Sequence, residues 1–108
     1  MEDVKCIVVI VERGKADKIV DKAKKVGAKG ATILYGRGTG QSEVMKFLHI
    51  HIEASKEMII ILSEADKYRP IYDAIIEAGR LKEPGTGIIF TIPVSNLVGL
   101  HHRKQFEE

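Results

Sequence analysis

The sequence predicts an α+β fold, in which an antiparallel sheet carries two helices on one of its faces. Two observations support this prediction. Short apolar runs rich in β-branched residues alternate with amphipathic segments of helical spacing along the chain. The chain has 108 residues, which suits one domain with one modest core, so residues 1–108 are expected to form a single domain.

The first apolar run predicts a strand that is buried on both faces. It extends from Lys5 to Val11 and ends at Glu12-Arg13-Gly14. Apolar residues then recur at helical spacing from Ala16 to Val26, and Gly27 closes the predicted helix. The lysines of this segment lie mainly off the apolar stripe, which predicts a solvated face.

The middle of the chain combines strand patterns with a run of glycines. Gly30–Tyr35 is a predicted strand, and Gly36–Ser42 is a glycine-rich break that can aim backbone N–H groups at an anion or simply turn the chain. Alternation from Lys46 to Glu53 predicts a half-buried strand. Residues 54–56 are expected to turn the chain into the next strand, Met58–Leu62.

A second amphipathic stripe predicts a helix that ends near Gly79. Pro70 suits an early helical position, so the helix is expected to start near Asp66, with Ser63 or Asp66 as its cap. A polar loop, Leu81–Gly87, follows this helix.

The last main strand is predicted at residues 88–94. Pro93 lacks a backbone donor, which indicates an edge strand or a strand end. The polar tail is expected to fray from about His102.

The resulting order, strand-helix-strand-strand-helix-strand, is the ferredoxin-like βαββαβ arrangement. Two helices cover only one face of such a sheet, yet several strands are apolar on both faces. An uncovered apolar face of this extent indicates an association site, so the sequence predicts an oligomer built by burying the open sheet faces.

Composition excludes several classes of function. A net charge of +2, with no Trp and few other aromatic residues, argues against a nucleic-acid partner. The single cysteine, Cys6, is expected to be a buried structural thiol. With neither a signal peptide nor a run long enough to span a membrane, the chain is expected to be cytoplasmic, without membrane insertion.

No catalytic constellation is visible in the sequence. The serines stand apart from any recognisable His–acid pairing. No carboxylate pair with an evident role in acid and base catalysis stands out. Surface positions are expected for Glu43, Glu53, Glu57 and Glu64. The sequence therefore predicts a protein that is not an enzyme.

Two long stretches resemble the PII signal-transduction family, also called nitrogen regulatory protein P-II. They read GKADKIVDKAKKVGAKGATILYGRGTG and EPGTGIIFTIPVSNLVGL. The resemblance extends from Cys6 to about Leu100, and its specificity comes from the order and spacing of short motifs. It implies a ferredoxin-like homotrimer that faces its sheets to the threefold axis. It also implies clefts between subunits for a small effector such as an adenine nucleotide.

The resemblance assigns residues to the effector site and to a partner-binding loop. The implied ligand-binding residues are Thr32, Gly38, Thr39, Gly40, Gly85, Thr86 and Gly87. The partner-binding loop corresponds to residues 41–56, with Gln41, Ser42, Glu43, Val44 and Met45 at its start. In the family, this loop contacts a transporter or a regulated enzyme.

The chain also departs from the family pattern at phosphate-binding cations. Ile88 stands where the family carries a lysine, and Gly99 and His101 stand where the last strand carries an Arg-x-Arg pair. These changes predict weaker charge-assisted binding of a polyphosphate. Candidate substitutes for these cations are Arg80, Lys82, Arg103 and Lys104.

Two alternatives remain open at this stage. The first is a metal-binding trimer resembling CutA, because His49 and His51 lie at alternate positions of a predicted strand and suit a transition metal. Metal is the less favoured reading because a third ligand is not evident. The second alternative is a structural oligomer without a ligand.

Overall fold

The structure is a computed structural model that describes residues 3–38 and 54–100. The order of its elements agrees with the predicted βαββαβ arrangement. These elements are β1 (Val4–Glu12), α1 (Ala16–Lys25), β2 (Thr32–Gly38), β3 (Ala54–Glu64), α3 (Tyr68–Gly79) and β4 (Gly87–Val94).

The strands form one antiparallel sheet in the order β2-β3-β1-β4. β1 and β3 lie at its centre, whereas β2 and β4 are its edges. Pro93 lies in β4, so the prediction that it marks an edge strand or a strand end is confirmed.

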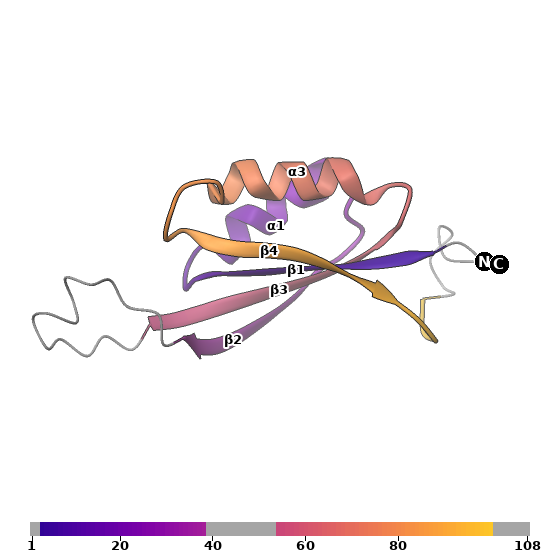
Figure 1. Cartoon of the computed structure of the whole chain (residues 1–108), viewed down its shortest axis with the longest axis horizontal. Helices are drawn as coiled ribbons and strands as arrows, with labels where there is room; N and C mark the ends of the chain where they lie inside the picture. The colour runs from indigo at the N-terminus through magenta and orange to yellow at the C-terminus, as the bar shows by residue number, and fades with distance from the viewer. Residues whose placement is uncertain (1–2, 39–53, 101–108) are drawn as a thin grey trace, which may run out of the picture.

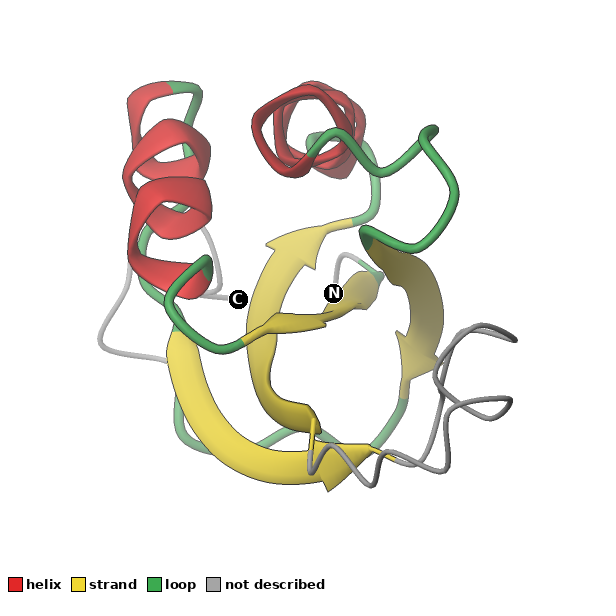
Figure 2. Cartoon of the chain, turned by 90° about the vertical axis from the view of Figure 1, so that its left-hand side faces the viewer, coloured by secondary structure: helices red, strands yellow, loops and turns green. Residues whose placement is uncertain are grey.

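Both helices lie side by side on one face of the sheet (Figures 1 and 2). Strand residues that face them alternate with residues on the other face, and Ile7, Val9 and Val11 of β1 are almost fully buried. They pack with Ile59 and Ile61 of β3 in the core. The helices complete this core with Ala16, Ile19, Val20, Ala23, Ile71 and Ile75.

The opposite face of the sheet, which we call the open face, is apolar and carries neither of the two described helices (Figure 2). Its most exposed large side chains are Leu34, Ile88, Phe90 and Ile92, which are between 41% and 54% exposed. The predicted uncovered face is therefore present. Cys6 lies on this face and is only half-buried, so the expectation of a buried thiol is wrong.

Two segments that were predicted to interrupt strands lie, in the described residues, within strands. Gly36, Arg37 and Gly38 lie in β2, because they pair with Lys56, Ser55 and Ala54 of β3. For the same reason the turn predicted at residues 54–56 is wrong, since β3 is continuous there. The Arg13 N–H also donates to the Ser55 carbonyl oxygen at 3.1 Å, which fixes this end of β3. The strand predicted at Lys46–Glu53 lies outside the described residues.

The helix predictions hold with small corrections. α1 ends at Lys25, and Gly27 follows with a φ of 121°, a conformation that favours glycine. Pro70 lies in the first turn of α3, as expected. The N-cap of α3 is Lys67, without a side-chain hydrogen bond, so the predicted Ser63 or Asp66 cap is wrong.

Two glutamates expected at the surface are buried. Glu57 is 5% exposed and Glu64 is 4% exposed. Glu57 accepts hydrogen bonds at the start of α1, and Glu64 pairs with Lys67. The donors to Glu57 lie 43 and 41 residues away in the sequence, so local patterns do not reveal this burial, whereas Lys67 is only three residues from Glu64.

Candidate functional site

Four of the predicted ligand-binding residues lie at one end of the sheet, which we call the glycine end, namely Gly38, Gly85, Thr86 and Gly87. β2 finishes there at Gly38, and β4 begins there at Gly87. The register confirms this placement, because Val11 of β1 pairs with Gly87 and the next residue, Glu12, pairs with Lys56, which in turn pairs with Gly36. Figure 1 shows this end at the left, where β3 and β4 begin and β2 ends.

Gly38 creates room for the side chain of Lys56. A Cβ atom at position 38 would lie 2.9 Å from Lys56 Cε and 3.2 Å from Lys56 Cγ. The aliphatic part of Lys56 therefore lies across Gly38, so the strand ends beside an ammonium group. The sequence pattern places Lys56 in a turn and gives no sign that it belongs to the effector site.

The loop between α3 and β4 is held by its own hydrogen bonds. The Thr86 hydroxyl shares its proton between the carbonyl oxygens of Arg80, at 2.8 Å, and Glu83, at 2.9 Å. Arg80 has a φ of 55°, and its guanidinium contacts Glu83 Oε1 at 2.9 Å. The Thr86 side chain therefore shapes the loop, which leaves backbone groups to contact a ligand.

The two loop glycines have different structural roles. Gly87 has a φ of 146°, and a Cβ atom there would lie 2.6 Å from the Ile10 carbonyl oxygen, so only glycine fits. Gly85 has a φ of 79° with open space around it. Neither the Gly85 N–H nor the Thr86 N–H donates to another residue of the described chain. Successive N–H groups of this kind can receive an anion.

The two glycine segments lie on opposite edges of the sheet. Gly38 ends edge strand β2, and Gly87 starts edge strand β4, with β3 and β1 between them. Three strand spacings separate these edges by roughly 14 Å. One chain therefore cannot close both segments around a small ligand, whereas the β2 edge of one copy and the β4 edge of a neighbour can do so.

The structure places the other predicted residues as follows. Thr32 is exposed at the start of β2 and pairs with Ile60, so it lies on the open face and away from the glycine end. Thr39, Gly40, the segment Gln41–Met45, and the histidines His49 and His51 lie outside the described residues.

The structure also shows where some of the residues lie that replace the phosphate-binding cations of the family. Ile88 is 54% exposed on the open face, directly after Gly87. The resemblance implied that Gly99 lies on the last strand, but β4 ends at Val94 and Gly99 lies beyond it. His101 lies outside the described ranges. Of the proposed substitutes, Arg80 is paired with Glu83 at the surface, where such a pair is weak and exchangeable.

Comparison with known proteins identifies the family. A sequence model described as "P-II: Nitrogen regulatory protein P-II" matches residues 4–104. The chain belongs to the P-II family. A search of curated protein sequences finds no match for the chain.

A solved P-II structure shows the same fold. It is the crystal structure of Arabidopsis thaliana PII bound to citrate, with a TM-score of 0.70 and 23% sequence identity. The match covers 99% of this chain and 88% of the plant chain. The P-II arrangement of strands and helices is thus reproduced here at low sequence identity.

Among the described residues, no helix is long and apolar enough to cross a membrane. The longer of the two helices, α3, has 12 residues, whereas a spanning helix needs about 20.

Proposed function

We propose that this P-II protein is a signal-transduction regulator that binds a small anionic effector between subunits. The observation that carries the proposal is the separation of Gly38 and Gly85–Gly87 on opposite edges at one end of the sheet. A shared site for these segments requires two copies of the chain. Family membership supports a regulatory role rather than catalysis.

The proposed assembly is a homotrimer that buries the open faces. Leu34, Ile88, Phe90 and Ile92 would leave water in such an assembly, and apolar burial contributes about 25 cal/mol per Å². The copy number rests on the family, since the open face by itself requires only some closed oligomer.

The effector is proposed to be an adenine nucleotide or another small anion. Gly85 and Thr86 offer backbone N–H groups, and Lys56 supplies a cation beside Gly38. The structure of the plant relative was determined with citrate, a polycarboxylate, which supports an anion as the ligand class. With Ile88 in place of a lysine, we expect effectors with few phosphates to bind as well as ATP does.

Signalling to a partner is proposed to run through residues 41–56, the last three of which belong to β3. Effector binding would favour one conformation of this segment, which requires that the effector bind that conformation better than the other. A transporter or an enzyme is the expected class of partner. Alanine substitution of residues 41–45 should abolish partner capture, and retained capture of every partner would refute this part of the proposal.

The test of the effector site is a titration of the purified protein with AMP, ADP, ATP, citrate and 2-oxoglutarate, followed by thermal unfolding and calorimetry. An effector that binds the folded state raises the unfolding midpoint. Lys56→Met should weaken binding about tenfold or more, whereas Lys18→Met on the exposed face of α1 should not change it. Absence of binding by the whole panel would refute the effector site.

The same titration with Zn²⁺ tests the metal-binding alternative. That alternative requires saturable metal binding that is lost when His49 and His51 are replaced by alanine. If neither metal nor anion binds, the ligand-free structural oligomer becomes the preferred interpretation.

A further inference from the structure

An arginine lies over an exposed tyrosine near the glycine end of the sheet. The Arg13 guanidinium carbon is 5.7 Å from the centre of the Tyr35 ring, and Tyr35 is 72% exposed. Tyr35 pairs with Glu57, whose side chain reaches the start of α1, so Tyr35 lies on the helix side of edge strand β2. Burial of the open face in an oligomer therefore does not require that this pair be covered.

The turn that carries Arg13 is held by hydrogen bonds to β3. The Arg13 N–H donates to the Ser55 carbonyl oxygen at 3.1 Å, and the Gly14 N–H donates to Glu57 Oε1 at 2.6 Å. The backbone of Arg13 is thus fixed before a partner arrives, which lowers the conformational entropy that binding must remove.

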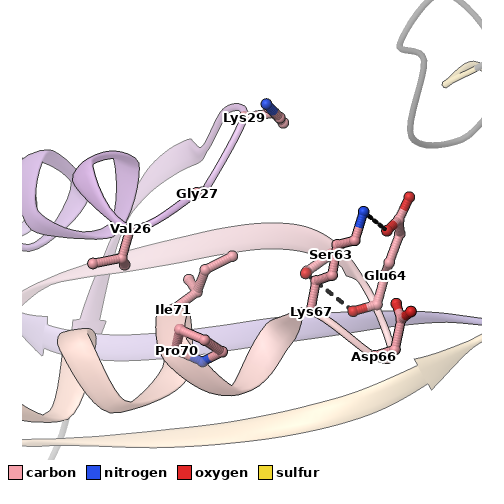
Figure 3. Close-up of a pocket in the computed structure, with 9 residues that line it drawn as sticks. All are labelled: Val26, Gly27, Lys29, Ser63, Glu64, Asp66, Lys67, Pro70 and Ile71. Atoms are coloured by element: carbon pink, nitrogen blue, oxygen red, sulfur yellow. Dashed lines mark hydrogen bonds and ion pairs between the residues drawn. The ribbon is translucent and has the colours of Figure 1, made fainter.

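Other cations on the surface already have a carboxylate partner. Arg69 also lies over a tyrosine, Tyr72, at 5.3 Å, but its Nε atom contacts Asp73 Oδ1 at 3.2 Å. At the end of the sheet opposite the glycine end, Lys67 Nζ lies 3.0 Å from Glu64 Oε2 at the border of the pocket drawn in Figure 3. The charges of these two cations are therefore compensated within the chain.

Arg13 has no such partner among the described residues. It is exposed, and no carboxylate of the described chain lies within ion-pair distance of its guanidinium. Glu57, which holds the same turn, is buried and accepts from backbone N–H groups instead. Arg37 adds a second exposed guanidinium on the same face of β2, two residues beyond Tyr35. The Arg13–Tyr35 pair thus presents a fixed positive charge beside an aromatic ring.

We propose that Arg13 and Tyr35 form a docking site for an acidic segment of a partner protein. A guanidinium stacked on a ring keeps the N–H groups at its edge free, and this planar fork matches a carboxylate. Tyrosine and arginine also contribute much of the binding energy at protein interfaces. A small free carboxylate fits less well, because Tyr35 is largely exposed whereas small-molecule sites enclose most of their ligand.

This docking site is separate from the proposed effector site. Lys56, which lies across Gly38, and Glu57, which holds the Arg13 turn, are neighbours in β3, so their side chains lie on opposite sides of the sheet. The effector cation thus belongs to the open-face side, and the docking site belongs to the helix side. The two proposals can therefore be tested independently.

The test is a titration of the isotope-labelled full chain with a decapeptide of alternating glutamate and serine, followed by backbone NMR. We expect saturable shifts at the amides of residues 13–16 and 35–37. The same peptide with glutamine in place of glutamate should bind about fivefold more weakly or less, since its side chains carry no charge. Absence of saturable binding, shifts confined to other residues, or equal binding of the two peptides would each overturn the proposal.

The two arginines that lie over tyrosines provide matched variants. Arg13→Gln should weaken peptide binding about fivefold, because the peptide carboxylate loses its charged donor, whereas Arg69→Gln should leave it unchanged. Tyr35→Ala should weaken binding as well, because the guanidinium loses the ring that orients it. Equal effects of Arg13→Gln and Arg69→Gln would overturn the proposal.

Two further titrations separate this proposal from the others. Citrate tests a small free carboxylate, and citrate binding at the same amides as tightly as the peptide would overturn the choice of a protein segment. Alanine substitution of residues 41–45 should leave peptide binding unchanged, whatever it does to partner capture. Loss of peptide binding in that variant would overturn the assignment to Arg13 and Tyr35.

Discussion

Glu57 of β3 caps the start of α1 from a position 43 residues away from Gly14. Its Oε1 atom accepts hydrogen bonds from the Gly14 N–H at 2.6 Å and the Ala16 N–H at 3.0 Å. The N-cap residue of α1, Lys15, has no side-chain cap of its own, so a distant strand satisfies these donors. The contact ties the turn after β1 to the beginning of β3, where the proposed signalling segment ends.

Glu57→Ala should therefore destabilise the protein by about 2 kcal/mol, because two N–H groups, that of buried Ala16 and that of Gly14, lose their acceptor. Glu57→Gln keeps an acceptor oxygen and should cost less. Urea unfolding curves measure both effects. The exposed Glu83 provides the control, and an equal loss in Glu83→Ala would contradict the capping role.

The two loop glycines should respond differently to alanine. Gly87→Ala places a methyl group 2.6 Å from the Ile10 carbonyl oxygen, so we expect a loss of about 3 kcal/mol or more. Gly85→Ala meets only an unfavourable φ and should cost about 1–2 kcal/mol. Thermal unfolding of the two variants checks this order, and a reversed order would show that the close approach at Gly87 is unimportant.

The Thr86 hydroxyl should be required for the shape of the loop before β4. Thr86→Val removes its hydrogen bonds to the Arg80 and Glu83 carbonyl oxygens and should cost about 1 kcal/mol. Thr86→Ser retains the hydroxyl and should behave like the parent. Amide hydrogen exchange across residues 80–87 is the measurement, and unchanged exchange in Thr86→Val would contradict this role.

Phe90 and Val26 provide a matched test of the open face. They are 41% and 44% exposed, but Phe90 lies on the open face and Val26 lies beside the helix layer. Phe90→Glu should dissociate the proposed oligomer, because a charge would be buried without a partner. Val26→Glu should leave it intact. Light scattering after size-exclusion chromatography gives the mass, and an assembled Phe90→Glu variant would exclude this face as the interface.

Cys6 should make stability depend on alkaline pH. Partial burial raises the pKa of its thiol above the ordinary value of 9.0. The folded state thus holds the proton more tightly than the unfolded state, so this contribution is present below pH 9 and is lost as pH rises through the raised pKa. Urea unfolding at pH 7 to 10 should show a steeper alkaline loss for the parent than for Cys6→Ser. If the free energy of unfolding falls with pH equally in both proteins, the Cys6 thiol does not cause the alkaline loss.

Local patterns in the sequence determined the order of the elements and the open face. β-Branched runs and helical spacing are properties of neighbouring residues, so they predicted β1, α1, α3 and β4 without knowledge of tertiary contacts. Gly36 and Gly38 led to the wrong prediction of a chain break, because pairing with β3 outweighs their local preference for a turn.

Tertiary structure alone decided how the candidate sites are built. The register between strands places Lys56 beside Gly38, and the strand order puts Gly38 and Gly87 on opposite edges. The cap at Glu57 likewise depends on where the chain returns after many residues. No local pattern specifies such contacts, because each depends on the packing of segments that are distant in the sequence.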